Sequence, residues 1–208
     1  MTNNPALSFP PASHRLLSVA DQPTPNATMN APPTYQWLST LGQLPRTIQE
    51  AMRLYGTTEV VGKGSNRTIL DWRDELNLAG VKITGYSDDD IPWCGLFAAI
   101  VCHRAGKPAI KDPLWARNWV SFGSKSPTPS LGDVLVFGRE GGGHVGFYIA
   151  EDASAYHVLG GNQSNKVCIT RVLKSRLLGC RRPPYNNMPA SVKPYRVAAA
   201  GGLSQNEA

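Results

Sequence analysis

The chain of 208 residues lacks several features that would assign it to a particular class of protein. It has no apolar run of about 18 residues, so neither a membrane-spanning helix nor membrane insertion is expected. Its four cysteines are too few for a disulfide-stapled scaffold. They form no Cys-x-x-Cys pair, so a structural zinc site is not expected either. The N-terminus has no basic stretch followed by an apolar core, so no secretory signal is predicted.

The chain also has no strong excess of charge. Lys and Arg number 21 and Asp and Glu 15, which gives a net charge of +6. A basic surface favours polyanions such as nucleic acid, anionic lipid or an acidic cell wall. The basic residues are scattered, however, apart from the short cluster at Arg181 and Arg182, and no basic helix or aromatic–basic platform is present. We therefore expect a mildly basic protein that does not bind nucleic acid.

Composition divides the chain into one folded domain and two tails. Residues 1–33 are rich in Pro, Asn, Ser and Thr without apolar periodicity, which predicts a disordered N-terminal arm. Residues 186–208 have a similar character and are predicted to form a flexible C-terminal tail. A single domain over residues 34–185, without internal repeats, is left between them.

Within this domain the period of the apolar residues changes from helical to extended. Helices are predicted over 45–56 and 66–80, and a third over 112–123 with Asp112 as its cap. Strands are predicted over 132–137, 144–151, 155–161, 166–173 and 177–183. Helices followed by a strand meander favour an α+β domain with an antiparallel sheet.

The segment DDDIPWCGLFAAIVCHRAG, residues 88–106, contains the first candidate for chemistry. Apolar residues on nearly all faces predict a buried central helix, with Pro92 before it and Gly106 ending it. Cys94 falls in the first turn, where the helix dipole lowers the pKa of a thiol. Position alone favours a buried structural cysteine over a nucleophile, and Cys102 is expected to be a core residue.

A nucleophilic thiol needs a base, and the chain has four histidines. His14 lies in the predicted disordered arm, and His103 lies nine residues after Cys94 on the same helix, too far to reach the thiol. His144 follows GREGGG and begins a strand, which would hold it rigidly at an open edge. His157 lies inside a strand, where packing is the simpler interpretation. His144 is therefore the preferred base.

The base needs a polar partner that fixes its orientation. LGGNQSN provides Asn162 and Gln163 at the end of the strand that follows His144. The two strands would bring these groups together if they pair as a hairpin, although the same composition suits a simple turn. Adjacent residues of a strand point to opposite faces, so only one of the two can serve. His157 remains a further candidate.

Four segments in combination resemble the NlpC-type and CHAP-type cell-wall peptidases. These segments are DIPWCGLFAAIVCHRAG, GDVLVFGREGGGHVGFYIA, VLGGNQSNKVCI and LLGCRRP. These are papain-like cysteine hydrolases of peptidoglycan, and the branch resembled occurs among phage lysis enzymes. The resemblance covers about residues 35–184. It implies a papain-like α+β fold in which the nucleophile begins a buried central helix packed on a C-terminal antiparallel sheet. It also implies that no metal or cofactor takes part.

Carried over residue by residue, the resemblance makes Cys94 the nucleophile, His144 the general base and acid, and Asn162 the orienting residue, with Gln163 as second choice. The thiolate of a Cys94–His144 ion pair would attack an amide of the peptide stem, and backbone N–H groups at the helix start would hold the oxyanion. Two residues are candidates for substrate contact by their position. Trp93 would line the cleft beside Cys94, although a first-turn tryptophan is at least as often a packing residue, and Gly143 would let a substrate backbone approach closely.

Several further expectations follow from the resemblance. The partner is bacterial peptidoglycan and the protein is a monomer, made in the cytoplasm and acting in the periplasm or cell wall. With no signal, a holin or a secretion system would export it, as a phage endolysin or a bacterial effector. The alternatives are a non-catalytic wall-binding module, expected to lose Cys94 or His144, and a thiol hydrolase or acyltransferase acting elsewhere.

Other residues keep simpler interpretations. Asp88, Asp89 and Asp90 are expected to be solvated loop acids, with helix capping or contacts to substrate amines as the alternatives. Asp133 is expected to be a turn residue. Cys168 and Cys180 lie in two predicted strands, and the sequence leaves open whether they pair.

Overall fold

A computed structural model describes residues 31–199 and 202–204 of the chain, so most of the predicted N-terminal arm lies outside the described residues. The helices come first in the chain and the sheet second, which confirms the α+β class. The α-helices are α1 (Arg46–Arg53), α2 (Arg67–Leu78) and α3 (Cys94–Arg104), and the 3-10 helices are η2 (Pro33–Thr40), η3 (Ala116–Ser121) and η4 (Lys174–Arg176). None of the described helices is long and apolar enough to cross a membrane.

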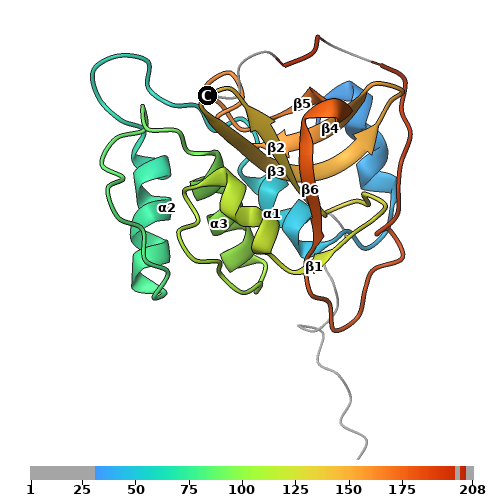
Figure 1. Cartoon of the computed structure of the whole chain (residues 1–208), viewed down its shortest axis with the longest axis horizontal. Helices are drawn as coiled ribbons and strands as arrows, with labels where there is room; N and C mark the ends of the chain where they lie inside the picture. The colour runs from blue at the N-terminus through green and yellow to red at the C-terminus, as the bar shows by residue number, and fades with distance from the viewer. Residues whose placement is uncertain (1–30, 200–201, 205–208) are drawn as a thin grey trace, which may run out of the picture.

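The strands form one antiparallel sheet in the order β1-β6-β2-β3-β4-β5 (Figure 1). The five predicted strands are all present, and β2 to β5 form the expected meander. After β5 the chain crosses back, so that β6 pairs with β2. Their bounds are β1 (Ser124–Lys125), β2 (Val134–Arg139), β3 (Gly142–Glu151), β4 (Ala155–Gly160), β5 (Cys168–Leu173) and β6 (Leu177–Arg182).

The helix predicted over 112–123 is wrong in its extent and its cap. Only the short 3-10 helix η3 forms there, and it begins at Ala116. Asp112 has φ of 48°, a left-handed conformation, whereas an N-cap residue normally has extended backbone. The prediction depended on Asp112, Pro113 and Gly123 as helix start and stop signals, but Trp115 between them is exposed and only Trp119 packs into the core.

The predicted buried central helix is α3, and every residue from Cys94 to Cys102 is buried. Phe97 packs edge-on against Phe147 of β3 with ring centroids 6.1 Å apart, and on its other side it contacts Trp72 of α2. Figure 1 shows α2 and α3 together on one side of the sheet. Burying one such aromatic side chain contributes about 1.5–3 kcal/mol, so this packing fixes where the N-terminus of α3 meets the sheet.

Asp133 does more than form a turn. Its carboxylate is fully buried and accepts hydrogen bonds from both Nε and Nη2 of Arg182 on β6, at 3.0 and 2.9 Å. It also accepts from the Ser126 hydroxyl and the Ser130 backbone N–H. A buried charge with this many donors holds the start of β2 against β6.

The segment after residue 185 differs from the expected flexible tail. Lys193 accepts a hydrogen bond from the Leu131 backbone, and Tyr195 accepts one from the backbone of Glu151 at the end of β3. The Val197 N–H then donates to the Glu151 carbonyl. The folded unit therefore continues past 185, because this segment supplies hydrogen-bond partners to the sheet.

All four cysteines are free and buried. Cys168 lies on β5 at one edge of the sheet, whereas Cys180 lies on β6, with β2, β3 and β4 between them. The sheet order therefore keeps the two thiols apart.

Candidate active site

Cys94 is the first residue of α3, and its side chain is almost fully buried. The backbone N–H of Val145 on β3 lies against its sulfur, as do the N–H groups of Gly95 and of Cys94 itself. Burial raises the pKa of the thiol, and the three N–H groups together with the charge of Arg139 partly offset that rise. The helix start is thus brought to the strand that carries His144.

His144 lies near the start of β3 and is fully buried. Its ring stacks on Phe137 of β2, with centroids 6.5 Å apart and an angle of 26° between the planes. Its Nε2 lies 3.1 Å from Oε1 of Gln163, which follows β4. Packing on one side and a hydrogen bond at one nitrogen fix the orientation of the imidazole.

The surroundings of Gln163 determine which of its amide atoms faces the histidine. Its Nε2 donates to the backbone carbonyls of Val158, Gly160 and Cys168 at 3.2, 3.3 and 2.6 Å. Its Oε1 also accepts from the hydroxyl of Thr170 at 2.7 Å. Carbonyl oxygens accept hydrogen bonds and an amide oxygen cannot donate, so the NH2 end faces these carbonyls and the oxygen faces the ring. His144 therefore carries a proton on Nε2, and the lone pair of the neutral ring is on Nδ1.

Asn162, the first choice for the orienting residue, has a different position. It adopts φ of +56°, which asparagine tolerates better than most residues, and is 3% exposed. The side chain that contacts the imidazole is that of Gln163, the second choice. As expected for neighbours in the chain, only one of the two reaches the ring. That either assists a reaction remains a prediction.

Trp93 precedes the candidate nucleophile but is fully buried. Its Nε1 donates to the Glu59 carboxylate at 2.9 Å, and its ring lies 6.0 Å from that of Trp72. A Cβ on Gly161 would come within 2.7 Å of the same ring, so the turn after β4 packs directly on it. Of the two roles that the sequence left open for Trp93, this burial favours packing over substrate contact.

The segment from Pro113 to Arg117 contacts both halves of the candidate site, a relationship that the sequence analysis missed. A Cβ added to Gly95 would lie 2.3 Å from the Pro113 carbonyl oxygen. A Cβ added to Gly143 would lie 2.9 Å from Cγ of Arg117. Gly143, predicted to admit a substrate backbone, thus admits the Arg117 side chain. The glycines beside Cys94 and His144 were the available signal, since a bare backbone allows such close approach.

His157, the weaker candidate for the third residue, belongs to a separate buried network. The hydroxyl of Tyr35 lies 2.7 Å from its Nδ1, and Asp152 lies 3.0 Å from its Nε2. Arg171 donates to the same carboxylate at 2.7 Å. Burial lowers the pKa of His157, and the hydrogen bond to Asp152 acts in the opposite direction. Both ring nitrogens are engaged, which suits a structural histidine.

Among the described residues, the cluster of three aspartates before α3 comes nearest to a cation site. One carboxylate oxygen from each of Asp88, Asp89 and Asp90 lies within 4.8 Å of the others. Asp89 is fully buried and accepts from the backbone N–H groups of Val60 and Asn66 at 2.9 and 2.7 Å. The expectation of a solvated acid therefore does not hold for Asp89, which braces two loops against each other. We assign no metal to this cluster.

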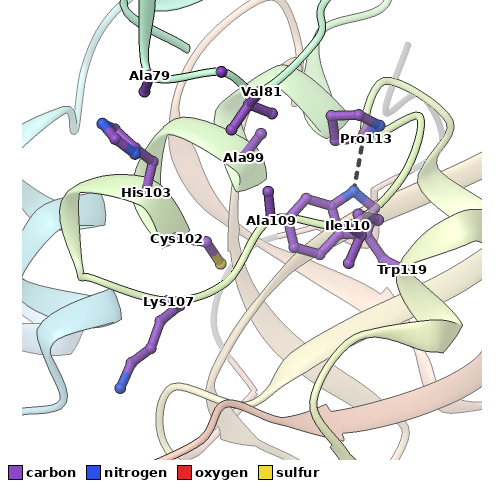
Figure 2. A pocket seen from close by; sticks show the side chains of 11 residues that line it. Ala79, Val81, Ala99, Cys102, His103, Lys107, Ala109, Ile110, Pro113 and Trp119 are labelled. Carbon is purple, nitrogen blue, oxygen red and sulfur yellow. Dashed lines mark hydrogen bonds between the residues drawn. The ribbon is translucent and has the colours of Figure 1, made fainter.

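A cavity of about 320 Å³ lies at the other end of α3, between its last turns, the end of α2 and the segment 107–119. Figure 2 shows Cys102 and Ala99 on the helix facing Ala109 and Ile110, with Trp119 donating to the Pro113 carbonyl at 2.9 Å. Burial raises the pKa of the Cys102 thiol far above its usual range. A fully buried thiol that keeps its proton suits the core role predicted for Cys102.

Comparison with known proteins adds no relative: no family model, no curated protein and no solved structure matches this chain. The case for a function therefore depends on the residues and their geometry.

Proposed function

We propose that the protein is a papain-like cysteine hydrolase that cleaves an amide bond in the peptide stem of bacterial peptidoglycan. The observation that supports this most is the hydrogen bond between Nε2 of His144 and Oε1 of Gln163. Its geometry leaves Nδ1 as the basic nitrogen of an imidazole on the strand that meets the Cys94 thiol. A cysteine at a helix start, a histidine and a polar side chain that holds the histidine are the parts that thiol acyl transfer requires.

The chemistry follows from the protonation states. Burial raises the pKa of Cys94, so the thiol loses its proton to Nδ1 of His144 as Sγ attacks the amide carbonyl carbon. The negative oxygen accepts hydrogen bonds from N–H groups at the start of α3. The tetrahedral species collapses as imidazolium donates its proton to the leaving amine, and an acyl-enzyme remains. Water, deprotonated by His144, then releases the acid and restores the thiol.

The substrate class is proposed from the resemblance and from charge. The motifs around Cys94, His144 and Gln163 resemble those of wall peptidases, and the net charge of +6 favours an acidic polymer. Action in the periplasm or wall, by way of a holin or a secretion system, belongs to the same proposal. So does a monomeric enzyme that uses neither metal nor cofactor.

Digestion of purified peptidoglycan tests the proposal, with the released fragments identified by mass. Cys94→Ala is expected to abolish release, and Cys102→Ala, on the same buried helix, is the matched control that should retain it. The masses identify the bond that is cut. Full release by Cys94→Ala would refute the mechanism. Intact walls together with acylation of Cys94 by an activated ester would favour the acyltransferase alternative.

A further inference from the structure

We propose that Arg139 binds a carboxylate group of the substrate beside the Cys94 thiol. The inference rests on the proposed function and names the part of the substrate that this end of the site recognises.

Arg139 is the last residue of β2 and pairs with Gly142 across the hairpin that leads to His144. A Cβ added to Gly142 would lie 3.4 Å from Nε of Arg139, so the guanidinium lies over this glycine of the hairpin. Its charge also acts on the Cys94 thiol, whose pKa it lowers. Arg139 therefore lies over the start of the strand that carries His144, and its charge reaches the Cys94 thiol.

One donor of the Arg139 side chain has no partner among the residues that the structure describes. Its Nε is buried and has no hydrogen-bond acceptor within residues 31–199 and 202–204. No carboxylate in that part of the chain forms an ion pair with it. By contrast, the partly buried Arg104, Arg171 and Arg182 are bound to Glu75, Asp152 and Asp133 respectively. A buried donor without an acceptor is unfavourable, so the binding of a ligand that supplies an acceptor is favoured.

The chemistry of the guanidinium indicates a carboxylate. Its planar fork matches two carboxylate oxygens and forms stronger hydrogen bonds with a charged acceptor than with a neutral one. Arg117 adds a second positive charge, and its Nε and Nη2 donate to the carbonyls of Gly142 and Arg139 at 2.8 and 3.4 Å. These bonds fix the backbone of the hairpin that carries Arg139. The peptide stem of the proposed substrate offers free carboxylates, and an amidated stem offers the neutral equivalent.

The test compares two synthetic stem peptides that differ only in a free carboxylate or a primary amide at the acidic residue. Both are titrated calorimetrically into the Cys94→Ala protein, which binds without turnover. We expect the acid to bind about 10- to 100-fold more tightly than the amide, the factor that a charged hydrogen bond provides. Arg139→Gln in the same background should abolish this preference, Arg139→Lys should retain part of it, and Lys125→Gln on β1 should leave it unchanged.

Equal binding of acid and amide to the Arg139-containing protein would overturn the inference. So would an effect confined to the thiol, in which Arg139→Gln shifts the pH dependence of Cys94 alkylation by iodoacetamide but leaves the acid preference intact. Failure of the proposed function would give another result: the protein would still bind the acid peptide more tightly than the amide, but it would not cut purified walls. Thermal melts of each variant exclude misfolding as the cause of lost binding.

Discussion

The Gln163 side-chain oxygen lies 3.1 Å from Nε2 of His144, and three backbone carbonyls hold the opposite end of the same amide. The orientation of this glutamine therefore determines the tautomer of the histidine. A carboxamide held in this way cannot turn its nitrogen toward the ring without bringing its oxygen against backbone carbonyls, where neither atom donates. Substitutions at Gln163 and Gly160 test this contact, and substitutions at Asp133 and His157 test the stability of the surrounding fold.

Replacing Gln163 should reduce turnover more than binding. In Gln163→Ala the His144 ring loses the acceptor for its Nε2 proton, so the other tautomer and other orientations become populated. We expect kcat for wall cleavage to fall by about 100-fold, with a small change in KM. Asn162→Gly is the matched control, since glycine adopts the left-handed backbone of Asn162 without strain. Equal losses in both variants would remove the case for Gln163 as the positioning residue.

A methyl group placed between His144 and Gln163 should lower kcat, as expected for Gln163→Ala, without removing either side chain. A Cβ at Gly160 would lie 3.0 Å from both His144 Nε2 and Gln163 Cδ, so ring and amide must separate. Gly160→Ala is expected to lower kcat by one to two orders of magnitude. In Gly138→Ala the new Cβ meets Leu178 at 3.5 Å, an ordinary contact, and activity should be retained. Wild-type turnover in Gly160→Ala would show that the contact is not needed.

Asp133 should matter for stability and not for chemistry. Asp133→Ala leaves the Arg182 guanidinium without its buried carboxylate, and the loss of one partner of such a pair costs about 3–5 kcal/mol. Urea unfolding measures this cost. Asp71→Ala, which removes an exposed ion pair with Arg67, should change stability by less than about 1 kcal/mol. Similar midpoints for the two variants would contradict the assignment.

The buried network at His157 should make the protein less stable in acid. Burial lowers the pKa of His157, so the unfolded chain binds a proton that the folded protein excludes. The pKa of Asp152 is also lowered, chiefly by its hydrogen bond with Arg171. The stability contributed by His157 is present above about pH 6.5 and is lost as the pH falls below it; that of Asp152 is lost below about pH 4.

Urea midpoints between pH 7.5 and 5 check the histidine contribution. The wild type should lose stability over this range, and His157→Gln should lose less, because glutamine does not titrate. His103→Gln, on the exposed end of α3, is the control and should follow the wild type. Parallel curves for wild type and His157→Gln would show that this network does not titrate as described.

Much of the fold could be predicted from the sequence, because the spacing of apolar residues and the positions of Gly, Pro and other turn residues specify local structure. The apolar run from Leu96 to Cys102 predicted a buried helix whatever its partners, and short β-branched or aromatic runs bounded by turn residues predicted the strands. The return of β6 to β2 was not predictable, since no local pattern encodes a pairing between distant strands. The order of the segment around Tyr195 was missed for the same reason: its stability comes from the edge of the sheet and not from its own composition.

The candidate site was predictable in its residues but not in its contacts. Cys94 and His144 follow from their places in a helix start and a strand start. The choice between Asn162 and Gln163 depends on the turn after β4, where Asn162 takes up the left-handed conformation and Gln163 is directed at the ring. Trp93 looked like a wall of the site because it precedes Cys94, yet its indole is buried against Trp72. Such details depend on tertiary packing.

Whether Cys94 forms an acyl-enzyme is tested most directly by the intact mass of the protein during turnover of a synthetic stem peptide. The reaction is quenched in acid before the mass is measured. We predict a covalent adduct equal to the acyl half of the peptide, located on Cys94 by digestion, which forms in the wild type and in Cys102→Ala and is absent from Cys94→Ala. An adduct on another residue, or cleavage of the peptide by Cys94→Ala, would contradict the account.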